Sequence, residues 1–172
     1  MQALPLPRTS PDDDALRHLP LISVIAPCLN AGPYLEEGLA SIYAQDYPRF
    51  EVMVVDDGST DDSVQQLPAL QARCGFTLLA QINAGVSAAL NTGLAHAQGK
   101  YVATPDLEDV VLPQSSRIRA AYLEEHPEHP CVGALVSFMG SDGNWLKDQH
   151  AAGVQLLDFD KTQLMPYRPS RK

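Results

Sequence analysis

The chain has 172 residues, which suits a single domain or one domain with a short tail. Its 12 basic and 21 acidic residues give a net charge of −9, and an acidic surface argues against electrostatic binding to nucleic acid or to anionic lipid. A phosphorylated ligand is therefore expected only where a positive group, such as a metal ion, mediates the contact.

The cysteines and the composition of the N-terminal residues indicate the cellular compartment. Cys28, Cys74 and Cys131 contain no Cys-x-x-Cys pair, so they indicate neither a disulfide framework nor a zinc site and favour a reducing environment. The first residues lack the apolar stretch of a signal peptide, and no run approaches the roughly 20 apolar residues of a membrane-spanning helix. These patterns predict a soluble, cytoplasmic protein.

The predicted elements begin after an N-terminal arm, residues 1–20, whose four prolines and acidic run are typical of a flexible linker. Apolar runs rich in β-branched residues then predict five buried strands. These strands cover 21–26, 51–55, 76–82, 100–105 and 131–139. The segment SDGN (141–144) predicts a turn into a hairpin, and residues 149–172 form a weakly patterned tail or the start of a further region.

Helical patterns separate the predicted strands. Leucine, isoleucine and tyrosine recur at helical spacing after Pro33, which can open a helix at its first position. Ser59 or Thr60 is expected to cap the next helix, and Pro68 to interrupt or limit it. Further helices are expected over 85–97 and 115–126. Alternating strands and helices with short connections predict an α/β fold, with a three-layer, Rossmann-like, mostly parallel sheet flanked by helices.

In such sheets, ligands bind beyond the carboxyl ends of the strands, which selects the loops 27–32, 56–60 and 106–112. Asp56 and Asp57 are adjacent carboxylates at a strand end, where they can accept hydrogen bonds from a base N–H or a ribose hydroxyl, and we favour this role over a simple turn. Asn83 and Gly85 precede an alanine-rich helix, whose first N–H groups can face an anion or merely begin a tightly packed helix.

An acidic cluster follows the predicted strand 100–105. Asp106, Glu108 and Asp109 place three carboxylates within four residues, and hard oxygen ligands of this kind suit Mg²⁺ or Mn²⁺. Such an ion offsets the negative charge of the chain and stabilises a departing diphosphate. The alternative is a solvated acidic turn. In contrast, the run His126-Pro-Glu-His129-Pro predicts a loop rather than a metal pair, because its two prolines exclude a helix.

Three segments, in this order and spacing, carry a family resemblance. They are PCLNAGPYLEEGLASIYAQDYPRFEVMVVDDGSTDDS, NAGVSAALNTGLAHAQGKYVA and PDLEDVVLP. Over about residues 21–140 the chain resembles the nucleotide-sugar half of a family 2 glycosyltransferase with the GT-A fold. The resemblance implies a nucleotide-diphospho-sugar donor bound by a domain spanning 21–148, Mg²⁺ or Mn²⁺, and inverting transfer to a polysaccharide or glycolipid acceptor. It also suggests peripheral association with a membrane complex.

By position, the resemblance assigns roles to individual residues. Asp106 and Glu108 stand where the family places its metal-binding and donor-binding carboxylates, with Asp109 in support. The resemblance assigns nucleotide binding to residues at the ends of the first three predicted strands and in the loops that follow them. These residues are Pro27, Leu29, Asn30, Asp56, Asp57, Asn83 and Gly85.

No catalytic base is assigned, because the acceptor half of the family normally follows where this chain ends. Glu108 stands in place of the commoner Asp, and Leu29 and Leu90 stand where the family often has an aromatic residue and an arginine. Two hypotheses therefore stay open. The chain is the donor-binding domain of a longer enzyme, or it is a degenerate, non-catalytic nucleotide-binding or scaffold module of a polysaccharide-synthesis system.

Overall fold

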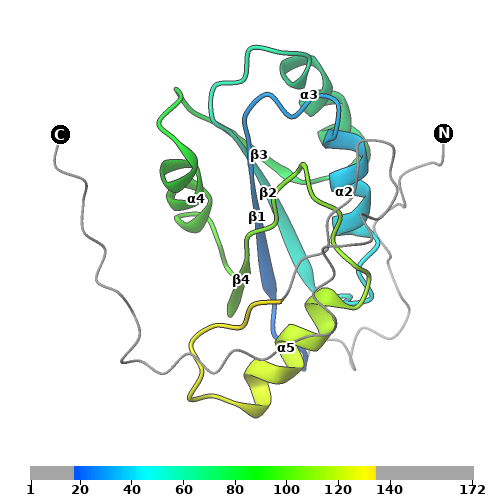
Figure 1. Cartoon of the computed structure of the whole chain (residues 1–172), viewed down its shortest axis with the longest axis vertical. Helices are drawn as coiled ribbons and strands as arrows, with labels where there is room; N and C mark the ends of the chain where they lie inside the picture. Colours follow the sequence, from blue (N-terminus) through cyan, green and yellow to red (C-terminus); the bar gives the residue numbers. More distant parts are fainter. Residues whose placement is uncertain (1–17, 135–172) are drawn as a thin grey trace, which may run out of the picture. The chain divides into compact units, whose positions relative to one another are not determined.

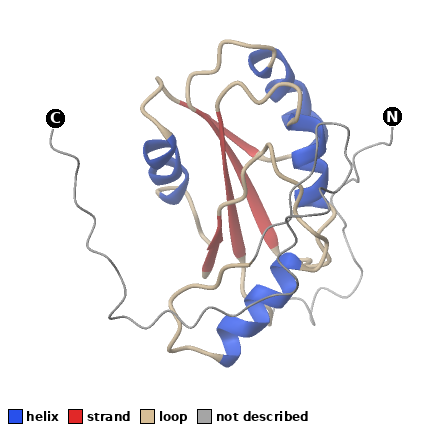
Figure 2. Ribbon diagram, in the orientation of Figure 1, coloured by secondary structure: helices blue, strands red, loops and turns tan. Residues whose placement is uncertain are grey.

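A computed structural model describes residues 18–134 of the chain. Its four strands are β1 (Ile22–Cys28), β2 (Phe50–Asp56), β3 (Thr77–Ala80) and β4 (Tyr101–Ala103). They form one sheet, drawn in red in Figure 2, and their order in it is β3-β2-β1-β4. Every pairing between them is parallel, from Ile22 opposite Phe50 to Asp56 opposite Ala80. The predicted α/β fold with a parallel sheet is confirmed.

Helices cover both faces of the sheet (Figure 1). Helices α2 (Leu35–Tyr43) and α3 (Ser63–Cys74) lie on one side, and α4 (Val86–Leu94) lies on the other. The fourth strand–helix repeat, which begins with β4, ends in α5 (Ser115–Glu125). The chain divides into two compact units between Ala121 and Tyr122, so α5 begins in the first unit and ends in the second. None of the helices within 18–134 is long and apolar enough to cross a membrane.

The alternation of side chains along the two central strands produces two cores. Val24 and Val54 point toward α2 and α3 and join Leu39 in the larger cluster of buried residues. Ile25 and Val55, their neighbours in sequence, point the other way and pack with Ala89 of α4. Because successive residues of a strand face opposite sides, unbroken apolar strands are the expected pattern for a sheet covered on both faces.

The start and the interior of α3 differ from the sequence-based expectation. Neither Ser59 nor Thr60 caps this helix; it begins at Ser63, and the Oδ1 atom of Asp61 accepts the Ser63 N–H at 2.9 Å. Pro68 does not interrupt α3 but lies inside it, with its side chain exposed. Burial of Leu67 and other apolar residues of α3 against the sheet outweighs the local cost of proline.

The strands predicted at 21–26 and 51–55 are present and slightly longer, as β1 and β2, whereas other predicted elements are shorter, absent or outside the described residues. The predicted strands 76–82 and 100–105 shrink to four and three residues, and the helix 85–97 ends at Leu94. Residues 131–134 of the predicted fifth strand are not in a strand, and its remainder lies outside the described residues. The turn at 141–144, most of the N-terminal arm and the tail at 149–172 also lie outside them.

Replacing Pro68 by alanine should stabilise the protein by about 1–3 kcal/mol. A proline in a helix interior costs roughly 3 kcal/mol relative to alanine. Proline also lowers the conformational entropy of the unfolded chain, which offsets up to about 1 kcal/mol of that cost. Urea unfolding at neutral pH measures the change. Pro33→Ala is the matched control, because Pro33 is also exposed but lies in the turn before α2; its effect should stay within about 0.5 kcal/mol. Equal effects of the two substitutions would contradict the placement of Pro68.

Candidate functional site

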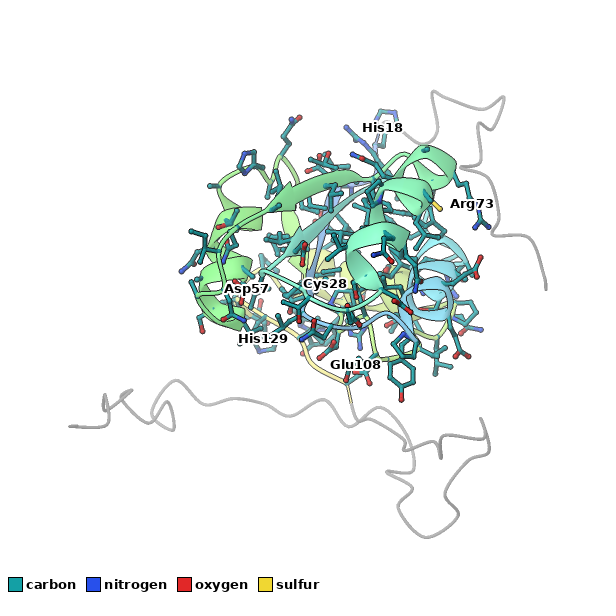
Figure 3. The ribbon with its side chains drawn as sticks, turned by 90° about the horizontal axis from the view of Figure 1, so that it is seen from above. His18, Cys28, Asp57, Arg73, Glu108 and His129 are labelled. Atoms are coloured by element: carbon teal, nitrogen blue, oxygen red, sulfur yellow. The ribbon has the colours of Figure 1, made fainter. Side chains whose placement is uncertain are left out.

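The carboxyl ends of the four parallel strands bring four loops to one edge of the sheet. β1 ends at Cys28, β2 at Asp56, β3 at Ala80 and β4 at Ala103, so the loops that follow all emerge on the same side. Figure 3 looks down on the molecule from above and labels Cys28, Asp57 and Glu108. All three predicted loops, together with the loop 81–85, therefore belong to this edge.

The loops after β1 and β2 are joined by Asn30. Its backbone adopts a left-handed conformation, with φ of 57°, and its N–H donates to the Ser59 hydroxyl at 3.0 Å. Its side-chain Oδ1 accepts the backbone N–H groups of Thr60 at 2.8 Å and Asp61 at 3.3 Å. Asparagine tolerates positive φ better than most residues and offers an amide oxygen as well. Asn30 thus fixes the spacing of the two loops, beside the half-buried Pro27 and the exposed Leu29.

The adjacent carboxylates Asp56 and Asp57 have different environments. Asp56 is partly exposed, and its Oδ1 accepts the Ser59 N–H at 2.9 Å. Asp57 is 2% exposed and accepts three hydrogen bonds from the loop after β3. The donors are the Gln81 side chain at 2.7 Å and the backbone N–H groups of Ala84 and Gly85, each at 2.9 Å.

These donors keep Asp57 ionised. The Ala84 N–H is the largest influence that lowers the pKa of the Asp57 carboxyl, and the Gln81 amide and the Gly85 N–H lower it further against the opposing effect of burial. Both oxygens of Asp57 thus bind the loop that contains Asn83 and Gly85. Sequence reasoning missed Gln81, whose own side-chain oxygen accepts a hydrogen bond from the Thr92 hydroxyl of α4.

The acidic loop after β4 alternates between solvent and core. Asp106, Glu108 and Asp109 are exposed, whereas Leu107 between them is 0% exposed and belongs to the larger core cluster. The Asp109 N–H donates to the Asp106 carbonyl at 3.2 Å, which closes a turn. Burial of Leu107 therefore fixes the loop against the core, while the carboxylates on either side of it are exposed to solvent.

Helix α2 holds the acidic loop from the side. A Cβ on Gly38 would lie 2.2 Å from the carbonyl oxygen of Leu107, so the two backbones are in contact. Ser41 Oγ accepts the Val111 N–H at 3.0 Å, and Gln45 Nε2 donates to the Leu112 carbonyl at 2.8 Å. Gly38 and Ser41 are three residues apart and lie on one face of α2, and Gln45 follows two residues after the helix ends. That spacing of small and polar residues is the signal that could have found them.

The exposed carboxylates fit a hard divalent cation. Asp106 and Glu108 form no ion pair with any lysine or arginine within residues 18–134. Within the same residues, the only hydrogen bond that their side chains accept is a long one, 3.4 Å, from the Glu108 N–H to Asp106 Oδ1. Carboxylate oxygens open to solvent are what Mg²⁺ and Mn²⁺ bind in proteins, with sites left for water or phosphate. Asp109 lies beside them as a third carboxylate.

Comparison with known proteins places this arrangement among glycosyltransferases. A family model described as Glycosyl transferase family 2 matches residues 23–171. Glycosyltransferase GlyG of Streptococcus pneumoniae is 34% identical over 127 residues, which cover 73% of this chain and 42% of that protein. The chain thus spans about two fifths of the length of this curated relative.

Two solved structures share the fold. TarS of S. aureus, in complex with UDP-GlcNAc, aligns with a TM-score of 0.56 and 33% identity over 62% of this chain and 32% of that chain. The mannosyltransferase PcManGT of Pyrobaculum calidifontis, in complex with GDP-Man and Mn²⁺, aligns with a TM-score of 0.53 and 35% identity over 69% of this chain and 35% of that chain.

The Asp57 network should make stability depend on pH. The pKa of Asp57 is lowered on folding from about 3.9, so its stabilisation is present above that pH and is lost as the pH falls through the lower, folded-state pKa. Asp57→Asn should therefore lower the urea midpoint at pH 7, and the difference from the unmodified protein should shrink below about pH 4.

Asp109→Asn provides the matched control, because the Asp109 side chain is exposed and accepts no hydrogen bond from the described residues. It should change the urea midpoint little at pH 7. A difference between Asp57→Asn and the unmodified protein that stays constant from pH 7 to pH 3 would contradict an ionised, hydrogen-bonded Asp57.

Proposed function

The chain belongs to glycosyl transferase family 2, and from this premise we propose that the carboxyl edge of its sheet binds a nucleotide-diphospho-sugar donor together with Mg²⁺ or Mn²⁺. The observation that carries the proposal is the acidic loop, in which Asp106 and Glu108 are exposed on either side of the buried Leu107. The relatives TarS and PcManGT, solved with UDP-GlcNAc and with GDP-Man and Mn²⁺, support the donor class and the metal.

Asp106 and Glu108 would hold the ion, with Asp109 adding negative charge beside them. When bound, the divalent cation supplies positive charge that stabilises the departing nucleoside diphosphate. Because the chain carries a net charge of −9, a donor diphosphate has little other compensation at this edge. The buried Leu107 fixes the backbone that carries the two carboxylates, so that mainly their side-chain torsions remain to be ordered on binding.

We assign the nucleoside to the loops after β1, β2 and β3. The partly exposed Asp56 and the exposed Asn30 face solvent at this edge, near Pro27 and Leu29. Asp57 orients the exposed loop that contains Asn83 and Gly85, rather than presenting a free carboxylate of its own. In this division of roles Asp56 contacts the ligand, and Asp57 positions neighbouring backbone groups.

The complete reaction requires more than these residues. Inverting transfer to a hydroxyl of a polysaccharide or glycolipid needs a base that takes the acceptor proton. We propose that the remainder of a longer protein supplies the base, since the chain spans about two fifths of the relative GlyG. We place the reaction in the cytoplasm, at the membrane face where lipid-linked acceptors lie; the cysteines Cys28, Cys74 and Cys131, all free, support a reducing compartment.

The first test is calorimetric titration of UDP, GDP and dTDP into the purified chain, with Mn²⁺ and with EDTA. We expect one nucleotide to bind in the presence of Mn²⁺ and to bind at least about tenfold more weakly with EDTA. Asp106→Asn combined with Glu108→Gln should abolish the Mn²⁺ dependence while leaving the urea midpoint unchanged, because exposed carboxylates contribute little to stability.

Glu37→Gln is the control for charge removal, since Glu37 is an exposed carboxylate of α2 and not part of the acidic loop. It should leave nucleotide binding intact. If no nucleotide binds to the folded chain, the donor-binding assignment is wrong, and the degenerate scaffold module becomes the better account.

Gly38→Ala tests whether α2 holds the acidic loop in place. The added methyl group would collide with the Leu107 carbonyl, so we expect a loss of about 1–3 kcal/mol in stability and a several-fold weaker Mn²⁺-dependent binding of the nucleotide. Gly93→Ala is the matched control, because its methyl group would meet Ile25 Cγ2 at 2.3 Å on the opposite face of the sheet. That control should lose stability but keep the Mn²⁺ dependence; equal losses of binding would argue against the Gly38 contact.

A further inference from the structure

A second group of metal-ligating side chains lies in the turn after α5, in the compact unit that begins at Tyr122. His126 N–H donates to the Tyr122 carbonyl at 2.9 Å, which continues the helical pattern to its end. The His129 N–H then donates to the His126 carbonyl at 3.0 Å and closes a four-residue turn with Pro127 at its second position. Proline fixes φ at this position in advance, so the turn is preorganised.

The turn gathers three potential ligands. His126, Glu128 and His129 each offer one ligand atom, and these atoms all lie within 4.8 Å of one another. His126 Nδ1 and Glu128 Oε1 are 3.2 Å apart, and the two imidazole rings lie 5.4 Å apart between centroids. The sequence predicted a loop here, which is correct, but the loop brings both histidines to the same side.

Tyr122 orients one of these ligands. Its hydroxyl lies 2.9 Å from His129 Nδ1, and the phenol and imidazole rings stack with an interplanar angle of 9°. Histidine ligands in metal sites generally have one ring nitrogen held by such a neighbouring group, which fixes the direction of the ring.

We propose that His126, Glu128 and His129 form a binding site for a borderline divalent cation of the Zn²⁺ class, separate from the acidic loop. Two imidazoles and one carboxylate are a donor set that suits Zn²⁺, whereas the all-carboxylate acidic loop suits Mg²⁺ and Mn²⁺. The three side chains are exposed or half-buried, so an ion reaches them from solvent. The bound ion links the end of α5 to the chain that follows it.

The test titrates Zn²⁺ into the chelator-treated full chain, followed by calorimetry, and repeats it with Co²⁺, whose visible absorption reports nitrogen ligation. We expect one Zn²⁺ per chain at this site. His126→Gln and His129→Gln should each weaken binding at least about tenfold, with loss of the Co²⁺ absorption, and Glu128→Gln should weaken it as well. All three changes lie in a solvent-exposed turn, and circular dichroism checks that each variant is folded.

Three control variants separate this site from others. His96→Gln removes an exposed histidine of the first compact unit, Asp106→Asn with Glu108→Gln removes the acidic loop ligands, and Cys131→Ser removes an exposed thiol near the turn. Each should leave the Zn²⁺ affinity of the turn unchanged. Zn²⁺ binding that survives His126→Gln and His129→Gln, or no Zn²⁺ binding at all, would overturn the proposal. The turn would then be held by its ring contacts and by the His126–Glu128 interaction without a metal ion. Neither outcome depends on nucleotide binding.

Discussion

Helix α2 approaches the acidic loop so closely at Gly38 that only hydrogen fits between the helix and the Leu107 carbonyl. The contact sets the distance between a rigid element and the loop by backbone rather than by side-chain packing. Ser41, on the same helix, and Gln45, just beyond its end, then bind backbone groups of Val111 and Leu112. The position of the carboxylates on the loop, and therefore the proposed metal site, depends on this helix, which itself donates no ligand.

The loops after β1, β2 and β3, at the same edge of the sheet, are held together by hydrogen bonds to side-chain oxygens. Asn30 and Asp57 each satisfy backbone N–H groups of a neighbouring loop, so three loops from separate strands are tied together by side-chain oxygens. Loops of this length have few apolar contacts of their own, and hydrogen bonds to a charged or amide oxygen are the available means of ordering them. Two of the polar residues expected to meet a ligand thus also shape the surface around it.

The central part of the fold could be predicted from sequence because β1 and β2 are mostly apolar runs and face a helix on either side. The ends of elements were less predictable, because local rules competed. Asp61, two residues before Ser63, satisfies the start of α3 in place of the expected Ser59 or Thr60, and tertiary burial keeps Pro68 inside the helix. The partner of Asp57 could not be predicted at all, since Gln81 and Ala84 lie 24 and 27 residues away and meet it only when the sheet forms.

The burial of Leu107 has a consequence for the choice of ion. A loop whose middle residue is locked in the core cannot translate its backbone to follow cations of different radius. Any adjustment falls to the torsions of the flanking side chains, and a glutamate has one more rotatable bond than an aspartate. Glu108 therefore gives the proposed metal site a wider range of coordination distances than a second aspartate would, and rotamer changes at Glu108 are the proposed means of accommodating ions of unequal size.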